Sequence, residues 1–151
     1  MRIGEMMDRD LTAVGKNTSV ADVVDILSRH RVSGLPVVDE DGRIIGFISE
    51  KDIVRAALPG YFDLLQDPSF LPDYGQFQSR LFKISRDSVE KHMVSDVVYF
   101  DEEDSDFQVA MVLMQKNLKR APVIRNGIFV GVVSRADLLD HILHSREKES
   151  E

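Results

Sequence analysis

The sequence predicts an α/β fold of the mixed α+β kind, in which one strand–helix–strand–strand–helix unit occurs twice. The main observation is that GFISEKD (46–52) reappears as GVVSRAD (131–137), with glycine, serine and aspartate at the same spacing. Upstream apolar positions align at an offset of 86, which pairs Pro36 with Pro122, and the two motifs align at 85. The offset falls by one because the second copy is one residue shorter. The missing residue lies in a turn, where a deletion destabilises the fold least. Two copies of about 50 residues therefore organise the chain.

The first copy begins with LTAV (11–14), a short strand candidate, followed by a polar run. Ser19 is expected to cap the next helix, with Asp22 three residues later as the reciprocal capping partner. An apolar stripe at a spacing of 3.6 residues predicts that this helix packs on a core. The stripe consists of Val20, Val23, Val24, Leu27 and Val32.

Two strands and a second helix complete the copy. LPVV (35–38) is a continuous apolar strand, EDG is a tight turn, RIIGFIS (43–49) is another strand, and EKDIVRAAL opens a helix. The second copy repeats this order as VVYF, DFQVAMVLMQKN, APVI, the turn NG, IFVGVVS and RADLLDHILH. We expect the apolar residues of both copies to form the core, and Met111 and Met114 to fill irregular packing there.

Composition restricts the class of protein. The chain has 151 residues, no cysteine and a net charge of −7. This length can bury a core without disulfides, and the lack of cysteine excludes thiolate chemistry and fits a reducing cytoplasm. The negative charge argues against nucleic-acid binding, which needs a basic surface. No apolar run approaches the roughly 20 residues of a spanning helix, and the acidic N-terminus is unlike a signal peptide, so we expect a cytoplasmic protein without membrane attachment.

The segment between the copies differs from a flexible linker. It holds three of the five prolines and six of the eleven aromatic residues, whereas flexible linkers are rich in glycine and serine. We expect one or two short helices, interrupted near Pro68 and Pro72, that cover the core or form a dimer contact. A lid whose position depends on a ligand is the alternative.

The ordered set of elements, the apolar-Pro-apolar strand, the acidic turn and the G-h-h-S-x-x-D motif closely resemble the CBS domain. The resemblance covers about residues 6–57 and 92–144, so the chain looks like a tandem CBS pair, or Bateman module. It implies two β-α-β-β-α repeats with small mixed sheets, related by a pseudo-twofold axis. The helical insertion expected between them departs from the family, in which short links between the repeats are common. The expected divisions are repeat 1 at 1–57, the insertion at 58–90, repeat 2 at 91–145 and a charged tail at 146–151.

The resemblance implies a regulatory binding module and not an enzyme. Modules of this family bind adenosine-containing ligands such as AMP, ADP or ATP, without a covalent cofactor, and commonly form homodimers. We therefore expect binding of an adenine nucleotide and signalling to an effector protein that the sequence does not identify. The alternatives are a sensor of S-adenosylmethionine and an interaction module with vestigial clefts. The residues agree with the absence of catalysis, because they include no P-loop, nucleophile elbow or HExxH motif.

The serine and aspartate of the repeated motif permit two interpretations. S-x-x-D before an apolar run is a helix capping box, and Ser19 with Asp22 shows the same pattern with no suggested ligand. However, Ser49 follows a strand directly, and a helix N-terminus offers free N–H donors and a positive dipole to a phosphate. An aspartate in that first turn, such as Asp52, can accept hydrogen bonds from ribose hydroxyls. The two interpretations are compatible.

The resemblance also implies two clefts, each lined by both repeats. Cleft A would combine Thr12, Gly34, Leu35, Lys119, Arg120, Ser134 and Asp137. Cleft B would combine Ser33, Ser49, Lys51, Asp52, Val98 and Ala121. Thr12 offers a hydroxyl where Val98 does not, so we expect cleft A to bind better. Arg120 is favoured over Lys119 as a phosphate contact, although both could instead complement the dipole of the preceding helix.

Two further groups are not expected to bind metal. The four histidines lack ligand spacing. The acidic run at 101–106 lacks a calcium-loop pattern and is expected to solubilise a turn and to cap the following helix.

Overall fold

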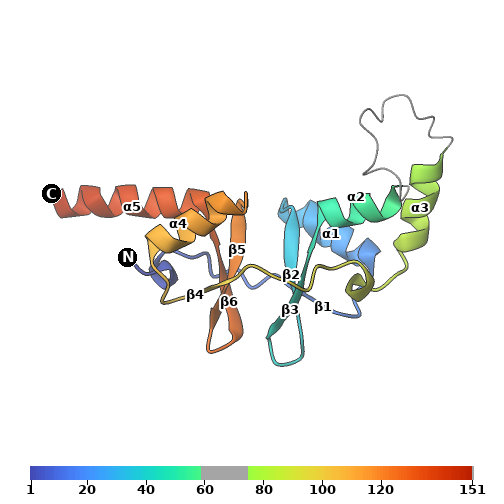
Figure 1. Ribbon diagram of the computed structural model, residues 1–151, viewed down its shortest axis with the longest axis horizontal. Helices are drawn as coiled ribbons and strands as arrows, with labels where there is room; N and C mark the ends of the chain where they lie inside the picture. Colours follow the sequence, from blue (N-terminus) through green and yellow to red (C-terminus); the bar gives the residue numbers. More distant parts are fainter. Residues whose placement is uncertain (59–74, 151) are drawn as a thin grey trace. The chain divides into compact units, whose positions relative to one another are not determined.

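The computed structural model describes residues 1–58 and 75–150, with side chains up to residue 145 (Figure 1). The expected helix interruptions near Pro68 and Pro72 lie outside the described residues. The chain divides into two compact units. Unit 1 comprises Met1–Thr12, Asp41–Ile44 and Val97–Glu151, and unit 2 comprises Ala13–Glu40 and Ile45–Asp96. Within the described ranges, no helix is long and apolar enough to cross a membrane.

Unit 2 contains the elements of the first copy. Its three-stranded sheet has the order β1 (Val14–Gly15), β2 (Gly34–Val38) and β3 (Ile44–Ser49), with β1 parallel to β2. Helix α1 (Val20–His30) follows β1, and helix α2 (Glu50–Ala57) begins directly after β3. Figure 1 shows α2 leaving the end of β3 without an intervening loop.

Unit 1 repeats the arrangement with the second copy. Its sheet has the order β4 (Phe100–Asp101), β5 (Arg120–Arg125) and β6 (Ile128–Ser134), in which β4 is parallel and β6 antiparallel to β5. Helix α4 (Asp106–Gln115) follows β4, and α5 (Arg135–Ser150) begins directly after β6. The predicted order of elements and the fold class are therefore confirmed.

The first strand of the first copy differs from the prediction. Strand β1 contains only Val14 and Gly15, because these are the residues that pair with Val37 and Val38 of β2. Leu11 lies before the strand and its side chain is 58% exposed. In α1 the predicted stripe is also narrower, since Val20, Val23 and Leu27 are buried, Val32 packs against them, and Val24 is exposed.

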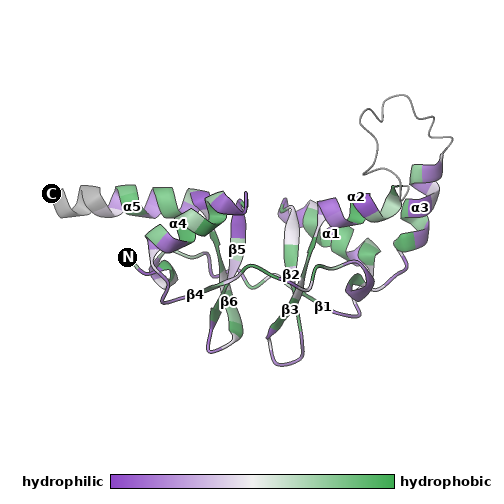
Figure 2. Cartoon of the chain, in the orientation of Figure 1, coloured by the Kyte–Doolittle hydropathy of each residue, from purple (hydrophilic) through white to green (hydrophobic). Residues whose placement is uncertain are grey.

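Each core is completed by residues at or just before the start of the other copy. The core of unit 1 includes Ile3, Met6 and Met7 from the N-terminal segment, packed with residues of the second copy. The core of unit 2 includes Val89, which lies just before the second copy, and Met93, near the start of the second copy, packs against this core. Figure 2 shows that β3 and β6, which these segments meet, are largely hydrophobic. The start of the first copy therefore belongs to the compact unit of the second copy, and the start of the second copy belongs to the unit of the first. We call these two stretches of chain the crossing segments.

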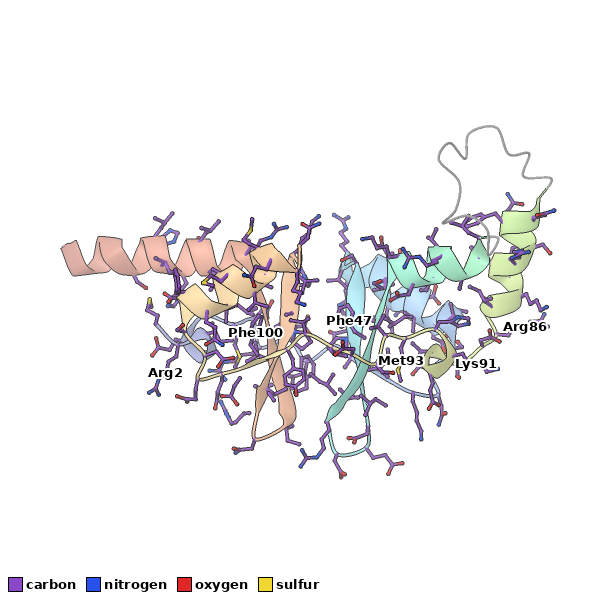
Figure 3. All side chains as sticks on the ribbon, viewed as in Figure 1. Arg2, Phe47, Arg86, Lys91, Met93 and Phe100 are labelled. Atoms are coloured by element: carbon purple, nitrogen blue, oxygen red, sulfur yellow. The ribbon has the colours of Figure 1, made fainter. Side chains whose placement is uncertain are left out.

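Backbone hydrogen bonds fix both crossing segments to the sheets. In unit 1, Asp8 and Val132 of β6 exchange two N–H···O bonds of 2.8 Å each. In unit 2, Val94 and Phe47 of β3 form the equivalent pair, also at 2.8 Å each. Figure 3 labels Phe47 and Met93, which lie on the two segments concerned. Val132 and Phe47 are equivalent positions of the repeat. In both units, therefore, a segment from the other copy pairs with the same position of the third strand.

The crossing explains the glycine of the repeated motif. A Cβ atom at Gly131 would lie 2.6 Å from the backbone oxygen of Asp8 and 2.9 Å from Sδ of Met7. At Gly46 it would meet Sδ of Met93 and lie 3.1 Å from the backbone oxygen of Val94. Both positions need glycine because another segment passes directly over them.

The interpretation of Met111 and Met114 as core residues was wrong. Their side chains are 46% and 64% exposed. Val109 and Leu113 are fully buried and define the face of α4 that packs on the sheet. Met111 lies two residues, or about 200°, from Val109 around a helix of 3.6 residues per turn, so it points away from the sheet.

The described part of the segment between the copies is ordered structure that covers the core of unit 2. Helix α3 (Gln76–Ile84) confirms a short helix there, and its Leu81 and Ile84 pack on that core. Beyond α3, the carbonyls of Asp87 and Ser85 accept from the N–H groups of Val20 and Ala21, at 3.0 Å each. These bonds satisfy donors in the first turn of α1 that have no partner within the helix.

An ion pair holds this segment after α3. His92 Nε2 lies 2.9 Å from Oδ2 of Asp87, and Lys91, labelled in Figure 3, lies 3.9 Å from Oδ1. The hydrogen bond from His92 lowers the pKa of the Asp87 carboxyl below its usual 3.8, desolvation opposes it, and the charge of Lys91 adds to the lowering. The folded state therefore favours the ionised carboxylate.

We expect the Asp87 interaction to stabilise the fold above pH 3.8 and to be lost as the pH falls through the lower pKa of the folded state. His92→Ala should lower the melting temperature near neutral pH, and its difference from the parent protein should shrink under acid conditions. Thermal unfolding across this range measures the effect. His30→Ala, a change at an exposed histidine of α1, is the control, and an equal pH dependence in both variants would contradict the prediction.

Candidate ligand-binding site

The predicted site residues fall into two groups, each within one unit. The repeat-1 half-site, in unit 2, consists of Ser33, Gly34, Leu35, Ser49, Lys51 and Asp52. The repeat-2 half-site, in unit 1, consists of Lys119, Arg120, Ala121, Ser134 and Asp137. Thr12 and Val98 also belong to unit 1.

One backbone hydrogen bond organises each half-site. The N–H of Glu50, the first residue of α2, donates to the carbonyl of Ser33 at 2.8 Å. The N–H of Arg135, the first residue of α5, donates to the carbonyl of Lys119 at 3.0 Å. In each unit the helix N-terminus is thereby held beside the residues that precede the proline-containing strand.

The serine and aspartate of both motifs form reciprocal capping boxes. Ser49 Oγ accepts from the N–H of Asp52 at 3.4 Å, and the Asp52 carboxylate accepts from the N–H of Ser49 at 2.9 Å. Ser134 and Asp137 form the same two bonds at 3.0 and 3.2 Å. Such a cap stabilises a helix by about 1 kcal/mol.

Ser19 forms a simpler cap. Its Oγ accepts from the N–H of Asp22 at 3.1 Å, but among the described residues the Asp22 carboxylate makes no return bond. The predicted reciprocal partnership of Asp22 was therefore wrong. Ser105 likewise caps α4 one way, from the N–H of Gln108 at 3.2 Å.

Each capping box uses one carboxylate oxygen. Oδ2 of Asp52 accepts both bonds from Ser49, and Oδ2 of Asp137 accepts the bond from Ser134. Over residues 1–58 and 75–145, Oδ1 of either aspartate has no hydrogen-bond partner. Both side chains are half-buried, so each half-site presents a fixed acceptor at a helix N-terminus. The capping and ligand-binding interpretations therefore do not compete for the same atom.

The residues before each proline offer mainly backbone groups. The side chains of Leu35 and Ala121 are 2% and 1% exposed and lie in the two cores. Any contact of these two residues with a ligand is therefore made by their backbone. Ser33, Lys51, Lys119 and Arg120 have exposed side chains.

The position of Lys119 and Arg120 weakens the helix-dipole interpretation. Helix α4 ends at Gln115, so Lys119 follows its end by about a turn, and the dipole interaction falls off within the last turn. Arg120 is the first residue of β5 and lies directly opposite Ser134 in the antiparallel pair. Directly opposed residues share one face of a sheet, so Arg120 and Ser134 project on the same side.

Thr12 and Val98 have different surroundings. The Thr12 hydroxyl donates to Oδ1 of Asp10 at 2.6 Å, which leaves its oxygen as an acceptor. Val98 packs against the core of unit 1 and has no polar group to offer. The structure therefore retains the chemical difference on which the predicted inequality of the clefts depends.

Phe47 is a site neighbour that the sequence analysis did not name. A Cβ at Gly34 would lie 2.5 and 2.8 Å from two atoms of the Phe47 ring, so the ring occupies the space of a side chain at position 34. In the second copy the equivalent residues are Arg120 and Val132. A comparison of the two pairs would have shown that the pair of the first copy contains an aromatic ring, Phe47, and the pair of the second copy contains a cation, Arg120.

Metal binding finds no support in the described residues. No group of three histidine, aspartate or glutamate residues there could hold an ion. The acidic run serves a turn, where Asp104 accepts from the N–H of Asp101 and Ser105 caps α4. The run also forms surface ion pairs: Arg125 lies 2.6 Å from Glu102, and Arg2, labelled in Figure 3, pairs with Glu103.

Comparisons with known proteins agree with this geometry. The profile of the CBS domain matches residues 3–59 and 88–144. Uncharacterized protein MJ1426 of Methanocaldococcus jannaschii is 26% identical over 155 residues, covering 95% of this chain and 92% of that protein.

Two solved structures show the same fold. CBSX2 from Arabidopsis thaliana, in complex with AMP, aligns with a TM-score of 0.72 at 21% identity, over 96% of this chain and 98% of that one. The CBS domain pair of MJ0100, in complex with methylthioadenosine and S-adenosyl-L-methionine, aligns with a TM-score of 0.68 at 20% identity, over 97% and 98% of the two chains.

Proposed function

The chain belongs to the CBS domain family, and we propose that it is a regulatory module that binds an adenosine-containing ligand. The carrying observation is the pair of capping boxes, in which Asp52 and Asp137 each keep one unpaired oxygen at a helix N-terminus. Such an oxygen accepts from ribose hydroxyls, and the adjacent N–H groups favour a phosphate. The adenosine compounds in CBSX2 and MJ0100 support this class of ligand.

The proposed mechanism is a ligand-dependent change in the population of two arrangements. A ligand shifts such an equilibrium only by the difference of its affinities for them. The effector is a partner chain, and a homodimer is the proposed assembly.

Calorimetric titration of the full chain with adenosine, AMP, ADP, ATP and S-adenosylmethionine tests the proposal. We expect saturable binding of at least one compound and a rise in melting temperature with its concentration. Mass spectrometry of the natively purified protein should find a co-purified adenosine compound. Absence of binding by all five compounds would refute the proposal.

An interaction module without ligand is the second candidate, favoured by exposed apolar residues on two helices. Phe107 and Met114 of α4 are 72% and 64% exposed, and Leu139 and Leu143 of α5 are 65% and 63% exposed. Exposed apolar surface of this kind marks protein contacts. A dimer that forms with no binding of adenosine compounds would favour this function.

The hydroxyl of Thr12 provides a residue-level prediction. We expect Thr12→Val to weaken binding at the better site by roughly 2- to 10-fold, the effect of one neutral hydrogen bond. Thr18→Val makes the same change at another half-buried threonine and should leave affinity unchanged. Two equally tight sites, unaffected by Thr12→Val, would contradict the predicted inequality.

A further inference from the structure

The two half-sites differ in charge at equivalent positions. Lys119, Arg120 and Arg135 give the second copy three positive charges around the start of β5 and of α5. The first copy has no net charge at the same places, because Glu50 and Lys51 cancel. The equivalent pairs are Ser33 and Lys119, Gly34 and Arg120, Glu50 and Arg135, and Lys51 and Ala136.

The cations of the repeat-2 half-site are not used in ion pairs. Arg2, Lys91 and Arg125 each pair with a carboxylate. Among the described residues, neither Lys119 nor Arg120 has such a partner within 4.0 Å. In a chain with a net charge of −7, two adjacent unpaired cations leave a locally positive surface, since charges farther than about 10 Å are largely screened.

The geometry places this charge at the capping box. Arg120 is opposite Ser134 in the β5–β6 register, and Lys119 is tied through its carbonyl to the N–H of Arg135. Arg135 itself directs Nη1 toward Sδ of Met114 at 3.9 Å, so Lys119 and Arg120 are the cations beside Ser134 and Asp137. Any phosphate bound at this helix N-terminus would therefore lie next to these two cations.

The repeat-1 half-site cannot provide the same surface. The Phe47 ring covers Gly34, so a cation at that position would not fit without displacing the ring. Ser33 is neutral, and the Asp52 carboxylate has no neighbouring pair of cations at these positions. Lys51 is the one cation among the residues of this half-site. The repeat-1 half-site therefore lacks the pair of adjacent cations with which the repeat-2 half-site can distinguish one phosphate from two or three.

From this asymmetry we infer that the repeat-2 half-site binds the phosphate chain of a nucleoside di- or triphosphate and selects it over the monophosphate. The inference rests on the proposed function and specifies its ligand class. Each phosphate beyond the first adds negative charge and acceptor oxygens for Lys119 and Arg120. We expect ATP or ADP to bind about 10- to 100-fold more tightly than AMP at this half-site.

Titration of ATP, ADP, AMP and adenosine into variants of the full chain tests the selection. Arg120→Gln, alone and with Lys119→Gln, should weaken ATP binding by about 10- to 100-fold and adenosine binding by less than about 3-fold. Raised salt should reduce the ATP preference of the parent protein. Arg125→Gln is the matched control, because it removes the same charge from the other end of β5, roughly 16 Å away, and should leave the preference unchanged.

A gain-of-charge variant provides the converse test. Ser33→Lys places a cation at an exposed position of the repeat-1 half-site and should strengthen ATP binding there about 3- to 10-fold relative to adenosine. Equal affinity of the parent protein for AMP and ATP would overturn the inference, and so would an unchanged ATP preference in the double variant. In either case, binding of adenosine would still support the proposed function. Binding of none of the four compounds would overturn the inference, and it would overturn the proposed function as well if S-adenosylmethionine also failed to bind.

Discussion

Replacing Gly131 with alanine is expected to lower the free energy of unfolding by about 2–4 kcal/mol. The new Cβ would lie 2.6 Å from the backbone oxygen of Asp8, a distance that no side-chain rotation relieves. The N-terminal segment must therefore move away from β6, which strains both hydrogen bonds between Asp8 and Val132. Chemical denaturation of the parent and variant proteins measures the change.

Alanine substitutions at two other glycines test whether the loss of stability follows the closeness of the neighbouring atoms. Gly46→Ala should cost less, because its nearest neighbour is the flexible end of Met93 and the backbone oxygen of Val94 lies 3.1 Å away. Gly15→Ala should be nearly neutral, since a Cβ there meets nothing within 4 Å. The order Gly131, Gly46, Gly15 is therefore expected, and a Gly131→Ala variant as stable as Gly15→Ala would disprove the steric account of the crossing.

Replacing Asp137 with asparagine is expected to weaken ligand binding by about 10- to 100-fold. The side-chain oxygen of asparagine can still accept from the N–H of Ser134, so the cap is largely kept while the charged acceptor is lost. Isothermal titration measures the affinity, and thermal unfolding in the absence of ligand measures the effect on the cap.

Asp22→Asn is the matched control for this change. Asp22 also lies in the first turn of a capped helix, but it makes no return bond among the described residues and belongs to neither half-site. The two variants should lose similar stability and differ in affinity. If Asp137→Asn binds as tightly as the parent protein, Asp137 acts as a helix cap alone.

Local patterns predicted most of the helices and strands. Strand β6 has the predicted bounds, and Ser19 and Ser49 cap helices as expected. The error at Met111 shows the limit of counting apolar residues, because α4 has more of them than its buried face can hold. Val109 and Leu113 occupy that face, and a stripe drawn through these two would have placed Met111 outside.

The exchange of the crossing segments was not predictable from periodicity. Asp8 joins Val132 through backbone atoms alone, and backbone pairing leaves no signature in residue type. The recurring glycine was the available signal, since Gly46 and Gly131 are equivalent and both lie under a crossing segment. The sequence also holds a sign of the contact between Gly34 and Phe47. It is recognised only when these two residues are compared with Arg120 and Val132, their equivalents in the second copy.

The crossing segments impose an order of folding during synthesis. Apart from the turn at 41–44, unit 2 runs from residue 13 to residue 96, so its residues emerge from the ribosome together. Unit 1 needs both Met1–Thr12 and the stretch from Val97 onward. Ile3, Met6 and Met7 therefore stay in water, as candidates for chaperone binding, until β6 has been made. We therefore expect unit 2 to fold first on the nascent chain and unit 1 to fold last, because the contacts of unit 1 close the longer loop.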